Sequence, residues 1–253
     1  MTSTGPGDWD ARTYDRIADP MTRWGETVLA RLEVEPDATV LDAGCGTGRV
    51  TEMLLDRVPE GRVVALDAAP SMVAEAQSRL AKYGDRVMVV HADLLDLGPG
   101  TLQGWGPVDG VLSTATFHWV LDHDRLFANL AGVLKPGGQL VAQCGAEGNI
   151  SGLMAAVRAT GVERTGAWLY ASPQDTRRRL EGAGFTDIEV WTNPEPTRIE
   201  RSEIGTYLET VCLRTLVAPM APEERGAFLA EVEKALGEPV IDYIRLNIVG
   251  RRA

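Results

Sequence analysis

Short apolar runs alternate with helix-like patterns along most of this chain. After a start rich in Gly, Ser and Thr, Met21, Trp24, Val28 and Leu32 recur at helical spacing, with Pro20 near the expected helix start. Seven short apolar runs are typical of strands, at 39–42, 62–66, 87–90, 108–112, 139–143, 188–191 and 240–249. Helical periodicity lies between them, at 50–58, 70–83, 126–134, 173–182, 204–211 and 222–236. Apolar strands separated by amphipathic helices indicate a buried parallel sheet with helices on both faces.

Local signals predict where several helices begin and end. Residues 172–175 form a capping box with Pro173 at the first helical position, and Asp122 or Asp124 can cap the helix that carries Leu126. The segment 136–138, Pro-Gly-Gly, is expected to end that helix, because proline cannot continue it and glycine accepts the turn.

The regions outside the regular alternation predict a cap. Two helical patterns between the last two strands look like an insertion, and we expect them to lie with the N-terminal helix over the sheet. The expected organisation is a single domain, 1–253, with a ligand-binding core at 36–150. The cap would comprise 8–35 and 197–238.

Composition and charge narrow the class of partner. The 253 residues carry 25 Lys and Arg against 36 Asp and Glu, a formal charge of −11, which argues against nucleic acids and anionic membranes. Cys45, Cys144 and Cys212 are far apart, and the three histidines lack metal-ligand spacing, so we expect neither a disulfide framework nor a metal site. The N-terminus has no apolar stretch typical of a signal peptide. We therefore expect a soluble, cytoplasmic protein, monomeric or homodimeric, that acts on a small molecule.

The most informative segment is the loop from Asp42 to Gly48, between a strand and a helix. Its glycines allow positive φ angles and a close ligand approach, and the helix N-terminus favours an anion. A dinucleotide fingerprint requires glycine where this chain has Arg49, and the third glycine stands one position early. Asp42, directly before the glycines, would repel a pyrophosphate but could receive an ammonium group. The pattern favours a zwitterionic ligand with an amino-acid tail.

Two further acids follow the next two strands. Asp67 ends the second strand, where its oxygens can accept from both hydroxyls of a ribose, and Asp93 can accept from an adenine amino group. Met72 and Leu94 could pack on the faces of that ring. Each acid also has a structural interpretation, Asp67 as a helix cap and Asp93 as a surface loop residue. Open α/β sheets bind ligands along the carboxyl edge that these acids would share.

Three segments resemble the class I S-adenosylmethionine (SAM)-dependent methyltransferases. TVLDAGCGTGRVTEMLL resembles their motif I, VVALDAAPSMVAEA their second motif, and LFANLAGVLKPGGQLV the helix, turn and strand that follow later. STATFHWVLDHDRLF, with residues 146–149, resembles the trans-aconitate methyltransferase-like branch, methyltransferase type 11 or 25. The resemblance implies an α/β, Rossmann-like, doubly wound and mostly parallel seven-stranded sheet, with an antiparallel last strand and a small helical cap. It also implies SAM as cofactor and S-adenosylhomocysteine as product.

The resemblance assigns roles to individual residues. It implies that Asp42, Gly44 and Gly46 contact the methionine part of SAM, Asp67 the ribose and Asp93 the adenine. The complete expected cofactor-binding set also contains Cys45, Ala68, Met72, Ala92, Leu94 and Ser113.

The acceptor site is expected near the segment 113–119, after the fourth strand. His118 is the candidate catalytic base, with an orienting or packing role as the alternative. The expected substrate-binding residues are Tyr14, Trp24, Phe117 and Trp119, and Arg23 or Arg214 could pair with an acidic substrate. We predict methyl transfer to a small organic acceptor through a carboxylate or hydroxyl oxygen. The alternatives are an NAD(P)-dependent Rossmann oxidoreductase and a non-catalytic SAM-binding protein.

Overall fold

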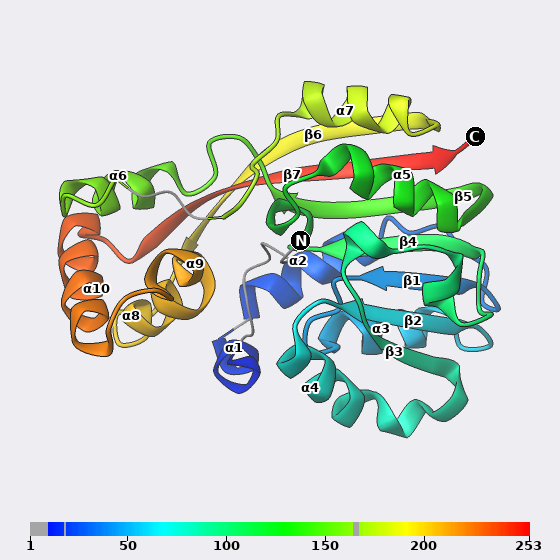
Figure 1. The fold of residues 1–253 in the computed structure, drawn as a ribbon, viewed down its shortest axis with the longest axis horizontal. Coiled ribbons are helices and arrows are strands. Elements are labelled where there is room, and N and C mark those ends of the chain that lie inside the picture. The colour runs from blue at the N-terminus through cyan, green and yellow to red at the C-terminus, as the bar shows by residue number, and fades with distance from the viewer. Residues whose placement is uncertain (1–9, 18, 164–166) are drawn as a thin grey trace.

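A single sheet organises the protein (Figure 1). The computed structural model describes residues 10–17, 19–163 and 167–253. Its strands are β1 (Thr39–Ala43), β2 (Arg62–Asp67), β3 (Val87–His91), β4 (Val108–Thr114), β5 (Leu134–Gly145), β6 (Phe185–Arg198) and β7 (Val240–Arg252). They lie in the order β3-β2-β1-β4-β5-β7-β6. The first five strands pair in parallel and β7 pairs antiparallel with both of its neighbours, which confirms the expected seven-stranded sheet with an antiparallel last strand.

Helices connect the strands and extend beyond one end of the sheet. They are α1 (Ala11–Ile17), α2 (Asp19–Leu29), α3 (Arg49–Arg57), α4 (Pro70–Leu80), α5 (His123–Val133), α6 (Ser151–Ala159), α7 (Pro173–Gly182), α8 (Ile204–Tyr207), α9 (Arg214–Val217) and α10 (Pro222–Leu236). A π-helical turn, Leu208–Cys212, continues α8. Among the described residues, no helix is long and apolar enough to cross a membrane.

Two apolar layers cover the faces of the sheet. Val40 and Val63 point to one face, where they pack in a cluster with buried residues of α2, α3 and α4. Leu41 and Val64, one position further along each strand, point to the other face and pack with buried residues of α5 and α7. Successive side chains of a strand alternate between faces, so strands apolar at every position require a helical layer on each side.

A third apolar cluster lies beyond the carboxyl ends of the parallel strands. Figure 1 shows α6, α8, α9 and α10 gathered there, at the far ends of β6 and β7. Buried residues of these helices pack with Trp24 of α2 and with Ile241 and Tyr243 of β7. At 14 and 13 residues, β6 and β7 are the longest strands, and they connect this helical group to the sheet.

Three local expectations differ from the structure. Helix α5 ends at Val133, before Pro136, because the residue before a proline disfavours helical backbone, and the Pro-Gly-Gly segment lies within β5. Strand β6 is far longer than 188–191 and contains Pro194 and Pro196, which an edge strand tolerates. Helix α6 was not expected, because its N-cap acceptor is Asp242, a residue distant in the sequence that accepts from the Gly152 N–H at 2.7 Å.

Candidate active site

The glycine loop after β1 adopts the conformation that its sequence allows. Gly44, Gly46 and Gly48 have φ angles of 87°, 54° and 85°, in the left-handed region. The N–H groups of Gly44 and Cys45 donate to the Leu66 carbonyl, at 2.8 and 2.9 Å, and hold the loop against the end of β2. Gly48 precedes α3 and provides no side-chain cap to the first turn of this helix, the end of a helix that favours an anion.

Asp42 places a buried carboxyl beneath this loop. Its Oδ2 accepts from Thr51 Oγ1 at 2.6 Å, whereas its Oδ1 is buried without a hydrogen-bond partner. Burial raises the pKa of this carboxyl to about 7; the Thr51 bond lowers it, and the charge of Asp67 raises it further. A buried oxygen without a partner is costly in the protein alone, so a cationic ligand at this point would satisfy it.

Asp67 is the last residue of β2 and Asp93 lies two residues after β3. Both are at the carboxyl edge of the parallel strands, as expected, and we call this edge the rim. Asp67 accepts from the Gly46 N–H and the Ala69 N–H, both at 2.9 Å, so it organises the loop as well as facing the rim. Burial raises the pKa of Asp67, although these backbone bonds lower it in part. Asp93 Oδ1 accepts from the Leu95 N–H at 2.9 Å and caps a short turn. Asp67 is not the N-cap of α4, because that position is Ala69 and has no side-chain cap, and Asp93 caps a short turn instead of lying free in a surface loop. Each carboxylate retains lone pairs for a ligand.

The other expected cofactor residues lie around the same rim. Ser113 is buried and donates from Oγ to the Ala43 carbonyl at 2.6 Å. The Ala92 N–H donates to the Asp67 carbonyl, while Ala68 is exposed beside it. The remaining three, Cys45, Met72 and Leu94, are buried.

A pocket lies next to this rim, between the sheet and the helical group. Its empty volume is about 460 Å³, part of which is open to solvent. Twelve residues line it: Tyr14, Trp24, Ala115, His118, Trp119, Asn149, Ile150, Tyr170, Val211, Cys212, Tyr243 and Arg245. Ala115, directly after β4, has a φ of 56°, which is strained for a residue with a Cβ. Such strain is common where a scaffold positions a functional loop.

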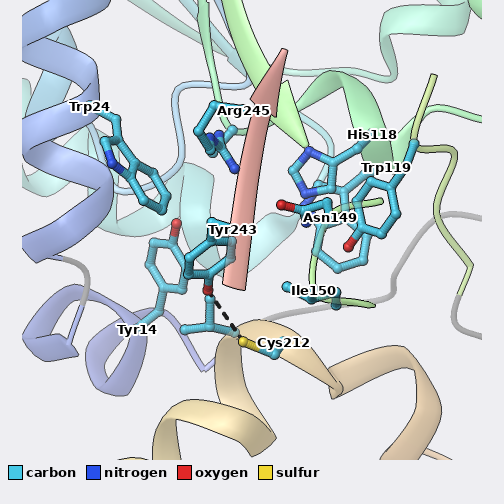
Figure 2. Close-up of a pocket in the computed structure, with 12 residues that line it drawn as sticks. Tyr14, Trp24, His118, Trp119, Asn149, Ile150, Cys212, Tyr243 and Arg245 are labelled. Carbon is cyan, nitrogen blue, oxygen red and sulfur yellow. Dashed lines mark hydrogen bonds between the residues drawn. The ribbon is translucent and has the colours of Figure 1, made fainter. Parts of the chain in front are cut away.

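Arg245, on β7, is the charged centre of the pocket wall (Figure 2). The residue is 2% exposed; its Nε donates to Gln143 Oε1 at 3.3 Å, and one terminal nitrogen is buried without a partner. Its guanidinium carbon lies 4.3 Å from the centre of the Trp24 ring. Burial lowers its pKa, and the nearby groups that oppose this are thiols and phenols such as Cys144 and Tyr243. Guanidinium stays protonated in proteins, so the site holds a positive charge without a carboxylate partner among the described residues.

His118 lies on the opposite wall in Figure 2, within a group of aromatic rings. Its ring stacks on Tyr170 at 5.7 Å and lies 4.9 Å from Trp119. Burial lowers the pKa of His118 well below its usual value, with a further contribution from Arg245, so the ring is neutral near pH 7. Its Nδ1 accepts from the Gly145 N–H at 3.4 Å, which assigns the proton to Nε2.

The structure brings most of the expected acceptor residues together and separates one from them. Tyr14, Trp24, His118 and Trp119 all line the pocket. Phe117 does not, because its side chain packs in the core, 6.0 Å from the ring of Phe127. Neither Arg23 nor Arg214 is among the lining residues.

Arg245 and Tyr243 are the main residues that sequence analysis missed. A charged side chain within the apolar run 240–249 was the available signal, because a buried strand rarely carries an arginine without a reason. Val211 and Cys212 reach the pocket from the π-helical turn, a feature with no recognisable sequence pattern. Within the part of the chain that the structure describes, no group of three or more His, Cys, Asp or Glu could hold a metal ion.

Known proteins are similar to this chain in sequence and in fold. A family model described as a methyltransferase domain matches residues 40–138. A trans-aconitate 2-methyltransferase from Methylobacterium nodulans is 31% identical over 97% of this chain and 98% of the relative. The solved phosphoethanolamine N-methyltransferase 2 of Haemonchus contortus, in complex with SAM, has a TM-score of 0.62 at 17% identity. The match covers 96% of this chain and 56% of that enzyme. The solved geranyl diphosphate C-methyltransferase of Streptomyces coelicolor has a TM-score of 0.59 at 18% identity. The match covers 96% of this chain and 83% of that enzyme. At these identities the two solved structures show the fold alone.

Proposed function

The chain belongs to the class I SAM-dependent methyltransferases, in the trans-aconitate methyltransferase-like branch, and from that premise we propose that it methylates a carboxylate oxygen of a small organic acid. One observation carries the proposal: the buried guanidinium of Arg245, with a nitrogen that lacks a partner, at the wall of the pocket. The name of the relative supports it, since trans-aconitate is a carboxylic acid. Family membership excludes the nicotinamide-dependent oxidoreductase and the non-catalytic SAM-binding protein.

The residues around the glycine loop fit SAM. Asp42 Oδ1, buried without a partner, can accept from the ammonium group, and the N-terminal N–H groups of α3 can bind the carboxylate. Asp67 and Asp93 keep lone pairs for the ribose hydroxyls and the adenine amino group. When bound, SAM supplies a methyl group on a positively charged sulfur, and its carbon–sulfur bond breaks as an acceptor oxygen bonds to the methyl carbon, leaving S-adenosylhomocysteine.

Arg245 would orient the acceptor. A guanidinium binds a carboxylate through two parallel hydrogen bonds, and the bond from Nε to Gln143 fixes its plane. Gln143 is itself held, because its Nε2 donates to Asn247 Oδ1 at 2.9 Å. Holding an acceptor in line for attack can contribute about 7–11 kcal/mol toward the barrier. A carboxylate carries no proton to remove, so the reaction needs no general base.

His118 would then act as a donor and not as a base. With Nδ1 engaged by the Gly145 N–H, the neutral ring presents a proton at Nε2, which can hydrogen-bond to an acceptor oxygen. This favours the orienting role of His118 over the role of catalytic base.

His118→Gln should keep kcat/KM within about tenfold of wild type, because its amide can donate near the position of Nε2. His118→Leu should lower kcat/KM further, by about 10- to 100-fold relative to wild type, and leave the affinity for S-adenosylhomocysteine unchanged. The deciding measurement is the pH profile at saturating SAM, carried well below pH 6, because burial lowers the pKa of His118 well below its usual value. An orienting donor gives profiles whose shape is the same in wild type and His118→Gln, whereas a base gives an acidic limb that the substitution removes.

Asp42 should make SAM binding depend on pH. The pKa of this carboxyl is about 7 instead of 3.8, so at pH 6 it is mostly protonated in the SAM-free protein, and it ionises to receive the ammonium group. Affinity should rise about tenfold from pH 6 to pH 8, and binding at pH 6 should release a proton. Calorimetric titrations in two buffers of different ionisation enthalpy measure both effects. Asp42→Asn should remove the pH dependence; wild-type binding without proton release would contradict the assignment.

Transfer of labelled methyl from SAM tests the proposed function. The purified protein is incubated with separate pools of carboxylic acids, alcohols and phenols, and amines. A methyl ester releases its label as methanol in mild alkali, whereas methyl ethers and methylamines are stable. Alkali-labile label from the acid pool alone supports the proposal. Label only in alkali-stable products would reject it.

A further inference from the structure

The positive charge that faces the pocket is too small to neutralise a substrate with several negative charges. Among the described residues that line the pocket, Arg245 alone is a cation, because His118 is neutral at ordinary pH. The other lining side chains are aromatic, aliphatic or uncharged polar groups. A second carboxylate on the substrate would therefore find no second cation among the described residues of these walls.

Three arginines outside the pocket already have partners. Arg49 and Arg79 both bind the carboxylate of Asp15, at 2.8 and 2.9 Å. Arg31 donates to Asn247 Oδ1 at 2.7 Å and lies over the ring of Trp191. None of these three arginines is among the lining residues, so each would have to leave its partner to reach an acceptor.

Several polar groups of the wall already have hydrogen-bond partners. Asn149 Oδ1 accepts from the Ile244 N–H at 2.9 Å. The hydroxyls of Tyr207 and Tyr243 lie 2.8 Å apart, and Cys212 Sγ lies 3.3 Å from the Tyr243 hydroxyl. Burial raises the pKa of Tyr14 and of Cys212 to about 12, which shows how poorly these surroundings stabilise an anion.

The space beside Arg245 is bounded by rings. In Figure 2, Tyr14, Trp24 and Tyr243 lie on one side of Arg245, and His118 and Trp119 lie on the other. Trp24 and Tyr243 meet edge to face at 5.1 Å. Rings hold their shape at low entropic cost and offer large apolar surfaces. An acceptor whose carboxylate meets Arg245 would place the rest of its body between these two walls.

We propose that the acceptor is an acid with a single carboxylate on an apolar body, aliphatic or aromatic, and not a di- or tricarboxylate. This inference rests on the proposed carboxylate methylation and specifies its substrate class. Arg245 pairs with the one carboxylate, the aromatic walls enclose the apolar part, and the product is a neutral methyl ester. The chain thus differs in acceptor class from a relative named for a tricarboxylic acid.

Matched pairs of acids test the proposal on the wild-type protein. Octanoate and octanedioate differ only in whether the far end is a methyl group or a carboxylate, and cinnamate and 4-carboxycinnamate form an aromatic pair; trans-aconitate is the fifth compound. Alkali-labile methyl transfer gives kcat/KM for each. Quenching of tryptophan fluorescence in the presence of S-adenosylhomocysteine gives affinity independently of turnover, because Trp24 and Trp119 line the pocket.

We expect at least one monocarboxylate to exceed its dicarboxylate partner and trans-aconitate by about 100-fold or more in kcat/KM, with affinities in the same order. Equal or better conversion of the diacids or of trans-aconitate overturns the inference and leaves carboxylate methylation standing. If no acid is methylated or quenches fluorescence while an alcohol or amine is methylated, the proposed function fails and the inference with it. If no acid is methylated or bound and no other compound reacts, the inference is likewise overturned.

Discussion

Replacing Arg245 with methionine should lower kcat/KM for the acid acceptor about 100- to 1000-fold while leaving SAM affinity within about threefold of wild type. Methionine replaces the unbranched apolar stem of the side chain and removes the charge and both hydrogen-bonding edges of the guanidinium. Truncating one partner of a buried, hydrogen-bonded charge pair typically costs about 2–5 kcal/mol of binding. The loss should appear in complexes with the acid and not in those with the cofactor.

The same substitution should not destabilise the protein. The guanidinium is 2% exposed and has a nitrogen without a partner, so its desolvation is incompletely compensated in the free protein. Replacing a buried ion pair by well-packed apolar residues is often neutral or stabilising, by about 1–4 kcal/mol, and Arg245→Met leaves no opposite charge behind, although Gln143 Oε1 loses its donor. We expect the free energy of unfolding of Arg245→Met to equal or exceed that of wild type in urea titrations. A protein that binds an acid through this residue accepts lower stability for function.

Arg251→Met provides a matched control on the same strand. Arg251 is partly exposed and bonds to Glu33 at 2.7 Å, away from the pocket. Its loss should leave kcat/KM near wild type, since exposed ion pairs contribute about 0–1 kcal/mol. If Arg245→Met methylates acids as well as Arg251→Met does, or if it loses acid and SAM affinity to the same extent, Arg245 does not anchor the acceptor.

Gly44→Ala should cause the largest loss of cofactor binding, with a fall of at least about tenfold in affinity for S-adenosylhomocysteine and of about 2–4 kcal/mol in the free energy of unfolding. Two effects add at this position. The φ of 87° disfavours any residue with a Cβ, and the new Cβ would overlap Thr116, lying 2.6 Å from the Thr116 Cβ. Calorimetry with S-adenosylhomocysteine and urea unfolding measure the two effects separately.

Gly104→Ala and a double variant separate strain from binding. Gly104 has a φ of 88° and nothing within 4 Å of an added Cβ, so its substitution adds conformational strain alone, about 1–2 kcal/mol. Combining Gly44→Ala with Thr116→Gly removes the overlap and should recover part of the stability. If Gly44→Ala binds the cofactor as tightly as Gly104→Ala, the loop does not cradle the amino-acid end of SAM.

The cofactor rim could be predicted from the sequence because its signals are local. Strand, glycine loop and helix follow each other without interruption around Asp42, and the positive φ angles that the glycines permit are those found. Asp67 is the last residue of β2 and Asp93 lies two residues after the end of β3, and parallel pairing brings such positions to one edge of the sheet. A count of residues along the chain was sufficient to place them together.

The acceptor pocket could not be predicted in the same way. Phe117 and Trp119 are two positions apart in one short turn, yet only Trp119 lines the pocket, and packing against Phe127 decides this. Arg245 comes from β7 and Cys212 from a π-helical turn, elements whose distance from His118 in the folded protein has no local signal. The cap of α6 by Asp242 is long-range in the same sense.

The sequence by itself determined the alternation of strands and helices, the kind of cofactor and the presence of acids along one edge of the sheet, because apolar periodicity and turn chemistry act between residues that are close along the chain. Only the tertiary structure decided that β7 inserts between β5 and β6, and that β6 and β7 carry helices beyond the sheet. It also decided that, among the described residues that line the pocket, Arg245 is the one arginine. Those features depend on contacts between distant segments, and their energies arise only when the whole chain has packed.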